Sequence, residues 1–149
     1  MKKNNQKGFT LIELLVVIAI IGLLSTMAVV ALNNARQKSR DAKRVADVKQ
    51  IQTALEMYFN SCNQYPELAV AGALTTTMAQ GCTTETLGTY LGQIPKEPTP
   101  DDNTCTAANN KYMYQAPVGG ATYTLTFCLG AATGQLAAGV RTASPVGVQ

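Results

Sequence analysis

The chain has 149 residues with 12 lysines and arginines against 9 aspartates and glutamates, enough for one domain with or without an appendage. Three of the lysines lie in residues 1–8 and the rest of the chain is formally neutral, so the net charge of +3 gives no reason to expect a nucleic-acid partner. The chain has no histidine, which excludes most general-base, triad and mixed-ligand zinc chemistry, and without a persuasive pair of catalytic side chains we expect no enzyme.

An apolar run follows the short basic segment 1–8. Residues 9–32 contain only four polar side chains, Thr10, Glu13, Ser25 and Thr26. As a helix this run is about 36 Å long, enough to cross a hydrocarbon core of about 30 Å. Apolar residues fall on every face, so we expect lipid or other helices to surround it. The single carboxylate stands out, because a charge within such a span is costly and usually marks function.

The helical pattern continues through residues 33–60 without a glycine or proline. Apolar residues recur there at three- and four-residue steps, as in an amphipathic helix, and the charged residues fall mostly on the other side. We therefore expect one helix from about residue 9 to residue 60, ended by Asn60-Ser61 and Pro66. Its distal apolar stripe consists of Val48, Ile51, Leu55 and Tyr58.

The second half of the chain predicts a small sheet. Residues 61–110 hold most of the helix breakers, so we expect a loop there with one short helix or turn near residues 83–94. Polar and apolar residues then alternate, and residues 111–117 and 121–129 predict a hairpin around Gly119-Gly120. Residues 135–140 are a candidate third strand. The fold class is α+β: a long helix whose distal half packs on an antiparallel sheet of about three strands.

All four cysteines lie in the second half of the chain, as Cys62, Cys82, Cys105 and Cys128. None forms a C-x-x-C pair, which argues against a zinc ribbon or a thioredoxin-like motif. An even number in a region with a small core indicates two disulfides and an oxidising compartment. Of the three possible connectivities we favour Cys62–Cys82 with Cys105–Cys128, because each bond then closes a single loop.

The start of the apolar run carries a family resemblance. Residues 7–13, KGFTLIE, resemble the cleavage and methylation site of type IV prepilins and of the related pseudopilins of type II secretion. The similarity is specific over residues 1–32 and looser through the rest of the long helix; beyond that it is limited to a small sheet and a terminal pair of cysteines. It implies a pilin-like fold with a cleaved leader (1–8), a membrane and assembly helix (9–32) and a globular head (33–149).

The resemblance also implies a processing site. In this family a membrane aspartic peptidase cuts after the glycine and methylates the new amino group, which implies cleavage between Gly8 and Phe9 and methylation of Phe9. The lysines of the leader would hold it on the cytosolic side. Glu13 would then lie one helical turn inside the mature chain and meet the Phe9 ammonium of a neighbouring subunit, because each group cancels a charge that is costly in lipid.

The implied partners are identical or related pilin subunits in a helical filament, the prepilin peptidase and the inner-membrane assembly platform. The precursor is expected to cross the inner membrane once, with its head outside the cytoplasm, and the assembled filament to be extracellular or at the cell surface. Six basic residues follow the span and three precede it, which by the positive-inside rule would place the head in the cytosol. The cleavage motif and the cysteines favour the outside.

One feature departs from the family pattern. Many members have a proline in the middle of the apolar helix, where part of the helix melts during assembly. The neighbourhood of Val30 has none, and Gly22 is the only helix breaker in the run. Whether this helix unwinds around Gly22 in a filament therefore stays open.

Other classes fit less well. The apolar core of a secretory signal peptide is about 7 to 15 residues long, shorter than this run, and a plain single-span receptor leaves the spacing of Gly8, Phe9 and Glu13 unexplained. A membrane-anchored or secreted, disulfide-stabilised binding domain is the alternative from another class. The basic stretch 36–49 has no aromatic residue to stack on bases, so we interpret it as a solvated helix face with charge pairs rather than a DNA-binding surface.

Asp101 and Asp102 lie in the segment PTPDDNTC. Because some pseudopilins bind calcium in a C-terminal loop, these two carboxylates are candidate calcium ligands. The D-x-D-x-D-G spacing is missing and a solvated turn fits the segment better, so we expect no obligatory cofactor. The sequence favours a type IV pilin precursor that polymerises into a filament for adhesion, motility or DNA uptake, with a type II secretion pseudopilin as the alternative.

Overall fold

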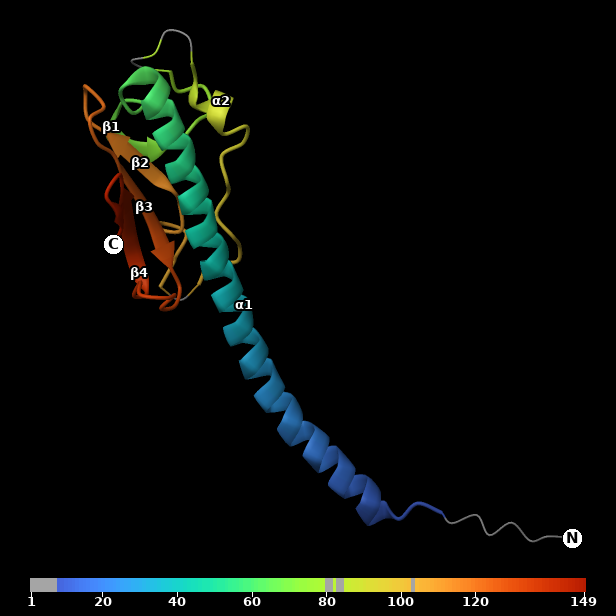
Figure 1. Ribbon diagram of the computed structural model, residues 1–149. Coiled ribbons are helices and arrows are strands. Elements are labelled where there is room, and N and C mark those ends of the chain that lie inside the picture. The colour runs from blue at the N-terminus through green and yellow to red at the C-terminus, as the bar shows by residue number, and fades with distance from the viewer. Residues whose placement is uncertain (1–7, 80–81, 83–84, 103) are drawn as a thin grey trace, which may run out of the picture. The chain divides into compact units, whose positions relative to one another are not determined.

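The computed structural model describes residues 8–79, 82, 85–102 and 104–149. They form two helices and five strands: α1 (Leu11–Cys62), β1 (Leu68–Ala73), α2 (Leu87–Tyr90), β2 (Met113–Ala116), β3 (Thr124–Leu129), β4 (Gly139–Ser144) and β5 (Gly147–Val148). The chain divides into two compact units, residues 1–36 and residues 37–149, and α1 runs through both of them (Figure 1). The expected helix, loop with a short helix, and antiparallel sheet are all present.

The long helix α1 agrees with the prediction from hydrophobic periodicity. It ends at Cys62, because Asn63 takes a left-handed conformation (φ 58°) and its N–H donates to the Phe59 carbonyl at 2.7 Å. Pro66, three residues later, prevents the helix from resuming. The local chemistry that ends the helix was therefore visible in the sequence, although the last turn extends two residues past the expected boundary.

The sheet is larger than predicted. Its five strands are all antiparallel to their neighbours and follow one another in chain order, β1-β2-β3-β4-β5. The prediction of about three strands missed β1, which lies in the segment expected to be a loop, and the two-residue β5. The third strand was placed at residues 135–140, but β4 begins at Gly139, because a tight turn with Gly134 at φ 61° pairs Thr133 with Leu136.

The core of residues 37–149 lies between α1 and the sheet. The predicted stripe of Val48, Ile51, Leu55 and Tyr58 has no exposed surface. Val48, Ile51 and Leu55 belong to one core cluster with inward side chains of β2 and β3, which include Tyr114, Leu125, Phe127 and Leu129. Figure 1 shows β2 and β3 alongside this distal part of α1. The period-two pattern of β3 thus meets the 3.6-residue pattern of the helix, as predicted.

The turn between β2 and β3 fastens the segment that follows α1. Gly120 has φ 49°, and a Cβ built there would lie 2.4 Å from the Tyr65 carbonyl oxygen, so both the conformation and the close approach require glycine. The Tyr65 N–H donates to the Gly120 carbonyl at 2.8 Å, and the Tyr65 ring contacts Tyr123 edge-on at 4.7 Å between centroids. These two contacts hold in place the segment that connects α1 to β1.

Candidate functional site

The first turn of α1 is built by a reciprocal pair of polar side chains. The Thr10 N–H and hydroxyl donate to the same Glu13 oxygen, Oε2, at 2.8 and 2.6 Å, and the Glu13 N–H donates back to the Thr10 Oγ1 at 3.3 Å. This is a capping box, in which residues three apart satisfy N–H groups that have no partner in the helix. Glu13 therefore starts the helix, and a negative charge there also interacts favourably with the helix dipole.

The expected cleavage position lies just outside this capping box. Gly8 and Phe9 precede the helix, a Cβ at Gly8 would meet nothing within 4 Å, and the Phe9 side chain is 80% exposed. The peptide between them is therefore open to an enzyme. Lys2, Lys3 and Lys7 of the expected leader lie outside the described residues.

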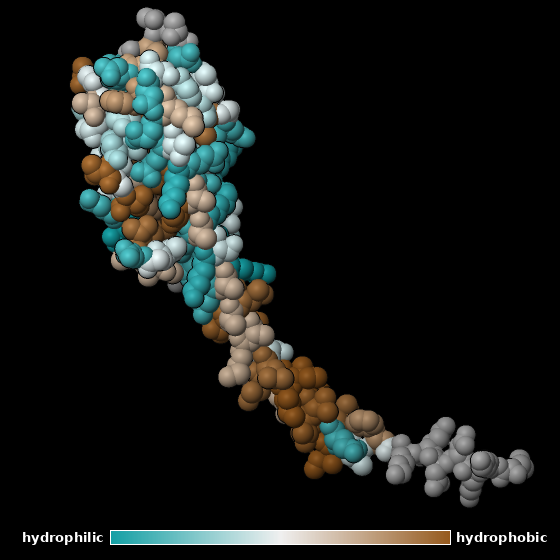
Figure 2. Space-filling model, in the orientation of Figure 1, coloured by the Kyte–Doolittle hydropathy of each residue, from teal (hydrophilic) through white to brown (hydrophobic). Residues whose placement is uncertain are grey.

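Among the residues that the structure describes, none covers the apolar half of α1. All large apolar side chains of residues 11–32 are exposed, by 45% to 80%. In Figure 2 this stretch is almost continuously brown, whereas teal and white side chains dominate the surface of residues 37–149. The helix is long and apolar enough to cross a membrane. Such a surface requires lipid or other helices around it.

The cysteines pair within residues 37–149. Cys62 is bonded to Cys82 and Cys105 to Cys128, with Cα atoms 5.3 and 5.6 Å apart. This is the pairing that the single-loop argument favoured. Cys62 and Cys82 are half-buried, whereas Cys105 and Cys128 are buried. The second bond ties the segment before β2 to the end of β3.

Two charged residues in the distal half of α1 do not lie on a solvated face. Asp41 and Arg44 are completely buried, and the Arg44 guanidinium donates to Asp41 and to Asp102, each at 2.7 Å. Asp102 also accepts hydrogen bonds from Arg40. The predicted charge pairing is present, since Arg44 pairs with Asp41 three residues earlier and Lys43 with Asp47 four residues later. The predicted solvation was wrong for Asp41 and Arg44, because Asp102 and Asn110 of the segment before β2 bind Arg44 over this part of the helix. Lys38, Lys43 and Lys49 do face solvent.

A similar pair lies one turn further along the helix. Asp47 is buried, and the Tyr112 hydroxyl donates to its Oδ2 at 2.9 Å. Burial raises the pKa of Tyr112, and the hydrogen bond to Asp47 adds to this effect, so the phenol stays protonated as the donor. Charged groups of α1 are thus paired inside the head with groups from outside the helix.

The two candidate calcium ligands have other partners. The Asp101 Oδ1 accepts a hydrogen bond from the Asn110 amide at 2.7 Å, and Asp102 binds both arginines. Burial alone would raise the pKa of Asp102, but the hydrogen bonds from Arg40 and Arg44 outweigh it and hold the pKa below its ordinary value. In the part of the chain that the structure describes, no group of three or more cysteine or carboxylate side chains is arranged to hold a metal ion.

Two features escaped the sequence analysis although signals for both were present. Thr10 and Glu13 have the T-x-x-E spacing of a capping box. Asp41 and Arg44 continue the spacing of the apolar stripe toward the N-terminus, in steps of three and four residues from Val48. A charged pair in register with a buried stripe indicates burial with a partner, and this spacing could have located the cluster.

Two family models match the chain. Residues 3–29 match the prokaryotic N-terminal methylation motif, and residues 31–140 match type II secretion system (T2SS) protein G. The second match covers most of the head, including α1 from residue 37 and strands β1 to β3. The comparison therefore extends well beyond the N-terminal motif.

Individual relatives agree with these models. A type II secretion system core protein G of Vibrio cholerae is 30% identical over 118 residues, which are 78% of this chain and 75% of that protein. The protein of the same name from Aeromonas hydrophila is 41% identical over 66 residues, 44% of this chain and 46% of that protein. A type IV major fimbrial protein, FimA, of Dichelobacter nodosus is 43% identical over 54 residues, 36% of this chain and 35% of that protein. For the Aeromonas and Dichelobacter proteins, then, the match covers less than half of their length.

Proposed function

This chain belongs to the type II secretion system protein G family of pilin-like structural subunits, and from that premise we propose that it works as a pseudopilin, a filament subunit of a secretion machine. The family consists of structural proteins rather than enzymes. The match to the protein G model over residues 31–140 favours the pseudopilin over the type IV pilin expected from the sequence, because it covers the head rather than the N-terminal motif, which both classes share. The shorter match to a fimbrial protein keeps a pilus subunit as the second candidate.

Processing is the first step of the proposal. The precursor is cut between Gly8 and Phe9, and the new amino group of Phe9 is methylated. The match to the N-terminal methylation motif supports this, as does the open, non-helical position of the Gly8–Phe9 peptide immediately before the capping box. Cleavage leaves Thr10 and Glu13 in place, so the mature helix keeps its first turn.

Membrane placement is the second step. The apolar half of α1 anchors the precursor in the inner membrane, and the head lies on the periplasmic side. Two disulfides in the head support an oxidising compartment. The leader lysines then remain in the cytosol with the peptidase and the assembly platform, which are the proposed partners.

Assembly is the third step, and one observation carries it. All large apolar side chains of residues 11–32 are exposed although the head of the same chain is well packed. Other copies of the helix cover this surface in a filament. Glu13 is the one carboxylate on it, and we assign it the Phe9 ammonium of a neighbouring copy as its partner, since two opposite charges enter an apolar environment more readily together than alone.

Intact mass and N-terminal sequencing of the protein from membranes test the processing step. The expected chain starts at Phe9, is heavier by one methyl group and is lighter by the four hydrogens lost in two disulfides. The Gly8→Val variant should remain uncut. Gly22→Val is the matched control, because a Cβ at either glycine meets nothing within 4 Å, and it should be processed normally. A wild-type chain that starts at Met1 would contradict the proposal.

A further inference from the structure

The Arg44 guanidinium lies at the centre of a buried polar cluster. Its Nη1 donates to Asp41 and Asp102 at 2.7 Å, and its Nε and Nη2 donate to the Asn110 amide oxygen at 3.2 and 3.0 Å. The Arg44 side chain is 1% exposed and the two carboxylates are 0% and 3% exposed. Oxygen atoms from α1 and from the loop 98–110 thus converge on one cation.

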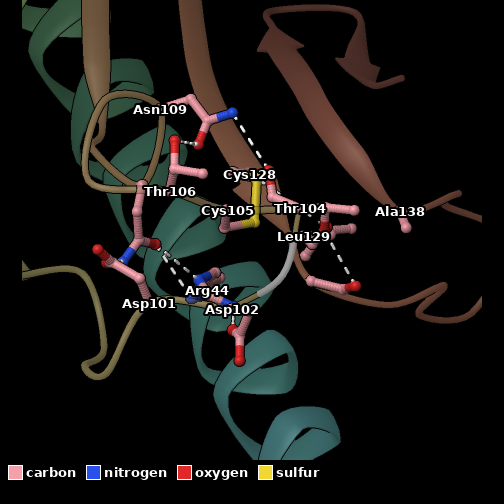
Figure 3. Close-up of a disulfide and its surroundings, with 12 residues drawn as sticks. Arg44, Asp101, Asp102, Thr104, Cys105, Thr106, Asn109, Cys128, Leu129 and Ala138 are labelled. Atoms are coloured by element: carbon pink, nitrogen blue, oxygen red, sulfur yellow. Dashed lines mark hydrogen bonds and ion pairs between the residues drawn. A yellow bond between two sulfur atoms is a disulfide. The ribbon is translucent and has the colours of Figure 1, made fainter.

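The oxygen atoms of the two carboxylates already have donors. The Asp41 Oδ1 and Oδ2 accept from the N–H groups of Gly130 and Ala131 at 2.8 and 2.9 Å, in addition to Arg44. The Asp102 Oδ1 accepts from Arg40, and its Oδ2 accepts from Arg44. Figure 3 shows Arg44 and Asp102 beside the Cys105–Cys128 disulfide, where the Asp102 N–H donates to the Cys105 carbonyl at 3.0 Å.

This arrangement does not fit calcium, the ion that the family resemblance suggested for Asp101 and Asp102. Calcium takes about six to eight oxygen ligands at about 2.3 to 2.6 Å, usually with carboxylates that no other cation neutralises. Here the two aspartates are balanced by two arginines, and N–H groups point at the oxygens that a metal would need. A calcium ion at Asp102 would have to displace two guanidinium groups.

We propose that the Arg44 guanidinium holds the 98–110 loop against α1, which is the role that a bound metal ion would have in a calcium-dependent head. The head therefore folds and keeps this loop in place without calcium. Arg44 joins α1 to the loop through Asp102 and Asn110, and Asp41 joins α1 to the residues after β3. The Asn110 amide nitrogen also donates to the Pro98 carbonyl at 3.3 Å and to Asp101, so the hydrogen bonds of the cluster continue along the loop.

Gly130 supports the tight fit of this cluster. A Cβ there would lie 2.7 Å from the Asp102 Cβ and 2.9 Å from the Gln37 amide nitrogen. The loop can therefore approach α1 closely enough for Asp102 to reach both arginines only because residue 130 has no side chain. The cluster depends on shape as well as on charge.

The first experiment measures thermal unfolding of the full-length protein in detergent, with calcium and with a chelator. All six tyrosines lie in the head, so the tyrosine band of the near-ultraviolet circular dichroism spectrum reports on the head alone. We expect the same unfolding midpoint under both conditions and no saturable heat on calorimetric titration with calcium. A midpoint that rises by several degrees with calcium, or a saturable site that Asp102→Asn removes, would overturn the proposal.

The second experiment replaces the cation. Arg44→Met keeps an unbranched apolar side chain but leaves two buried carboxylates with one guanidinium, and should lower the midpoint by roughly 10 °C or more. Arg44→Lys keeps the charge but not the planar set of donors, and should lie between wild type and Arg44→Met. Lys38→Met, on the exposed side of the same helix, is the control and should unfold like wild type.

Equal midpoints for Arg44→Met and Lys38→Met would refute the role of Arg44. If Arg44→Met fails to fold, Arg44→Lys and the calcium response of the wild type still decide the question. None of these measurements requires processing or assembly, so a failure here is distinguishable from a failure of the proposed pseudopilin function.

Discussion

Within α1, residues 11–32 expose all their large apolar side chains, whereas Val48, Ile51, Leu55 and Tyr58 have no exposed surface and even Asp41 and Arg44 are buried. Both halves are regular helix without a proline. The difference lies in what each half packs against. The sheet and the loop 98–110 cover the distal half, whereas no residue in the described part of the chain covers the proximal half. The two halves of α1 therefore have the same secondary structure. They differ in whether other described residues of the chain cover their side chains.

The charged groups follow the same division. In the distal half, buried acids are paired with arginines, a tyrosine hydroxyl and backbone N–H groups from outside the helix. In the proximal half, the carboxylate of Glu13 is hydrogen-bonded to Thr10 in its own first turn, and to no other side chain among the described residues. A carboxylate on an apolar surface with so local a set of partners is the place where a second chain is expected to contribute.

The largest expected effect comes from Glu13→Leu. Removing the carboxylate leaves the ammonium of a neighbouring copy without a partner in an apolar environment, so the yield of filament should fall more than about tenfold. The unfolding midpoint of the head should not change. Shearing and immunoblotting measure the first quantity and near-ultraviolet circular dichroism the second. Glu13→Asp, which keeps the charge, should retain part of the filament yield. A normal filament yield from Glu13→Leu would refute the proposed pairing of Glu13 with Phe9.

Leu55→Ala addresses the other half of the helix. Leu55 has no exposed surface, so its truncation should reduce the free energy of unfolding of the head by about 2 to 5 kcal/mol. Leu32→Ala is the matched control: Leu32 is 50% exposed and lies in the proximal unit, and its truncation should leave head stability unchanged. Denaturant titration of both variants measures the free energy of unfolding of the head. Equal decreases would contradict the claim that only the distal half of the helix contributes to head stability.

The two disulfides sharpen the comparison within the head. They span 20 and 23 residues, so loop-closure entropy predicts similar losses of about 3 kcal/mol when either is removed. The Cys105→Ala/Cys128→Ala variant should lose more than Cys62→Ala/Cys82→Ala, because its sulfurs are buried beside the Arg44 cluster. Denaturant titration of the two double variants decides this; a larger loss from the half-buried pair would contradict the account.

A smaller effect is expected from acid. The pKa of Asp102 is lower in the folded head than its ordinary value of 3.8, so its ion pairs stabilise the fold fully above that value, and this contribution is lost as the pH falls through the folded pKa. The stability difference between wild type and Asp102→Asn should therefore shrink as the pH falls from neutral to below the ordinary aspartate pKa of 3.8. Unfolding of both proteins between neutral pH and acid measures it, and a constant difference would argue against the ion pairs.

The sequence predicted those parts of the fold that depend on periodic burial. The stripe at Val48, Ile51, Leu55 and Tyr58 and the alternation along β3 have strong patterns because each buries one face. Strand β1 escaped prediction because it is an edge strand with mostly exposed residues, LAVAGA, that show no alternation. Strand β4 was misplaced because only one of its six residues, GVRTAS, is buried, so no apolar alternation marks it.

The candidate site divides in a similar way. Gly8, Phe9 and Glu13 were located by a motif of contiguous residues, and their chemistry is local. The burial of Arg44 and Asp41 depends on Asp102 and Asn110, which lie about 60 residues away in the chain. No local pattern specifies a partner at that distance, so charged residues at these positions were interpreted as solvated.

The most direct test of the central claim is a distance between two chains. Filaments are assembled from a mixture of subunits, one set labelled with ¹⁵N in phenylalanine and the other with ¹³C at the side-chain carboxyl of glutamate, and solid-state NMR measures dipolar contact between the Phe9 amine and the Glu13 carboxylate. The account predicts contact in the mixed filament, which can arise only between subunits. Two results would contradict the account: contact that appears only when one chain carries both labels, or no contact at all. Either would mean that the Glu13 carboxylate finds its partners within its own helix and that the apolar surface alone drives assembly.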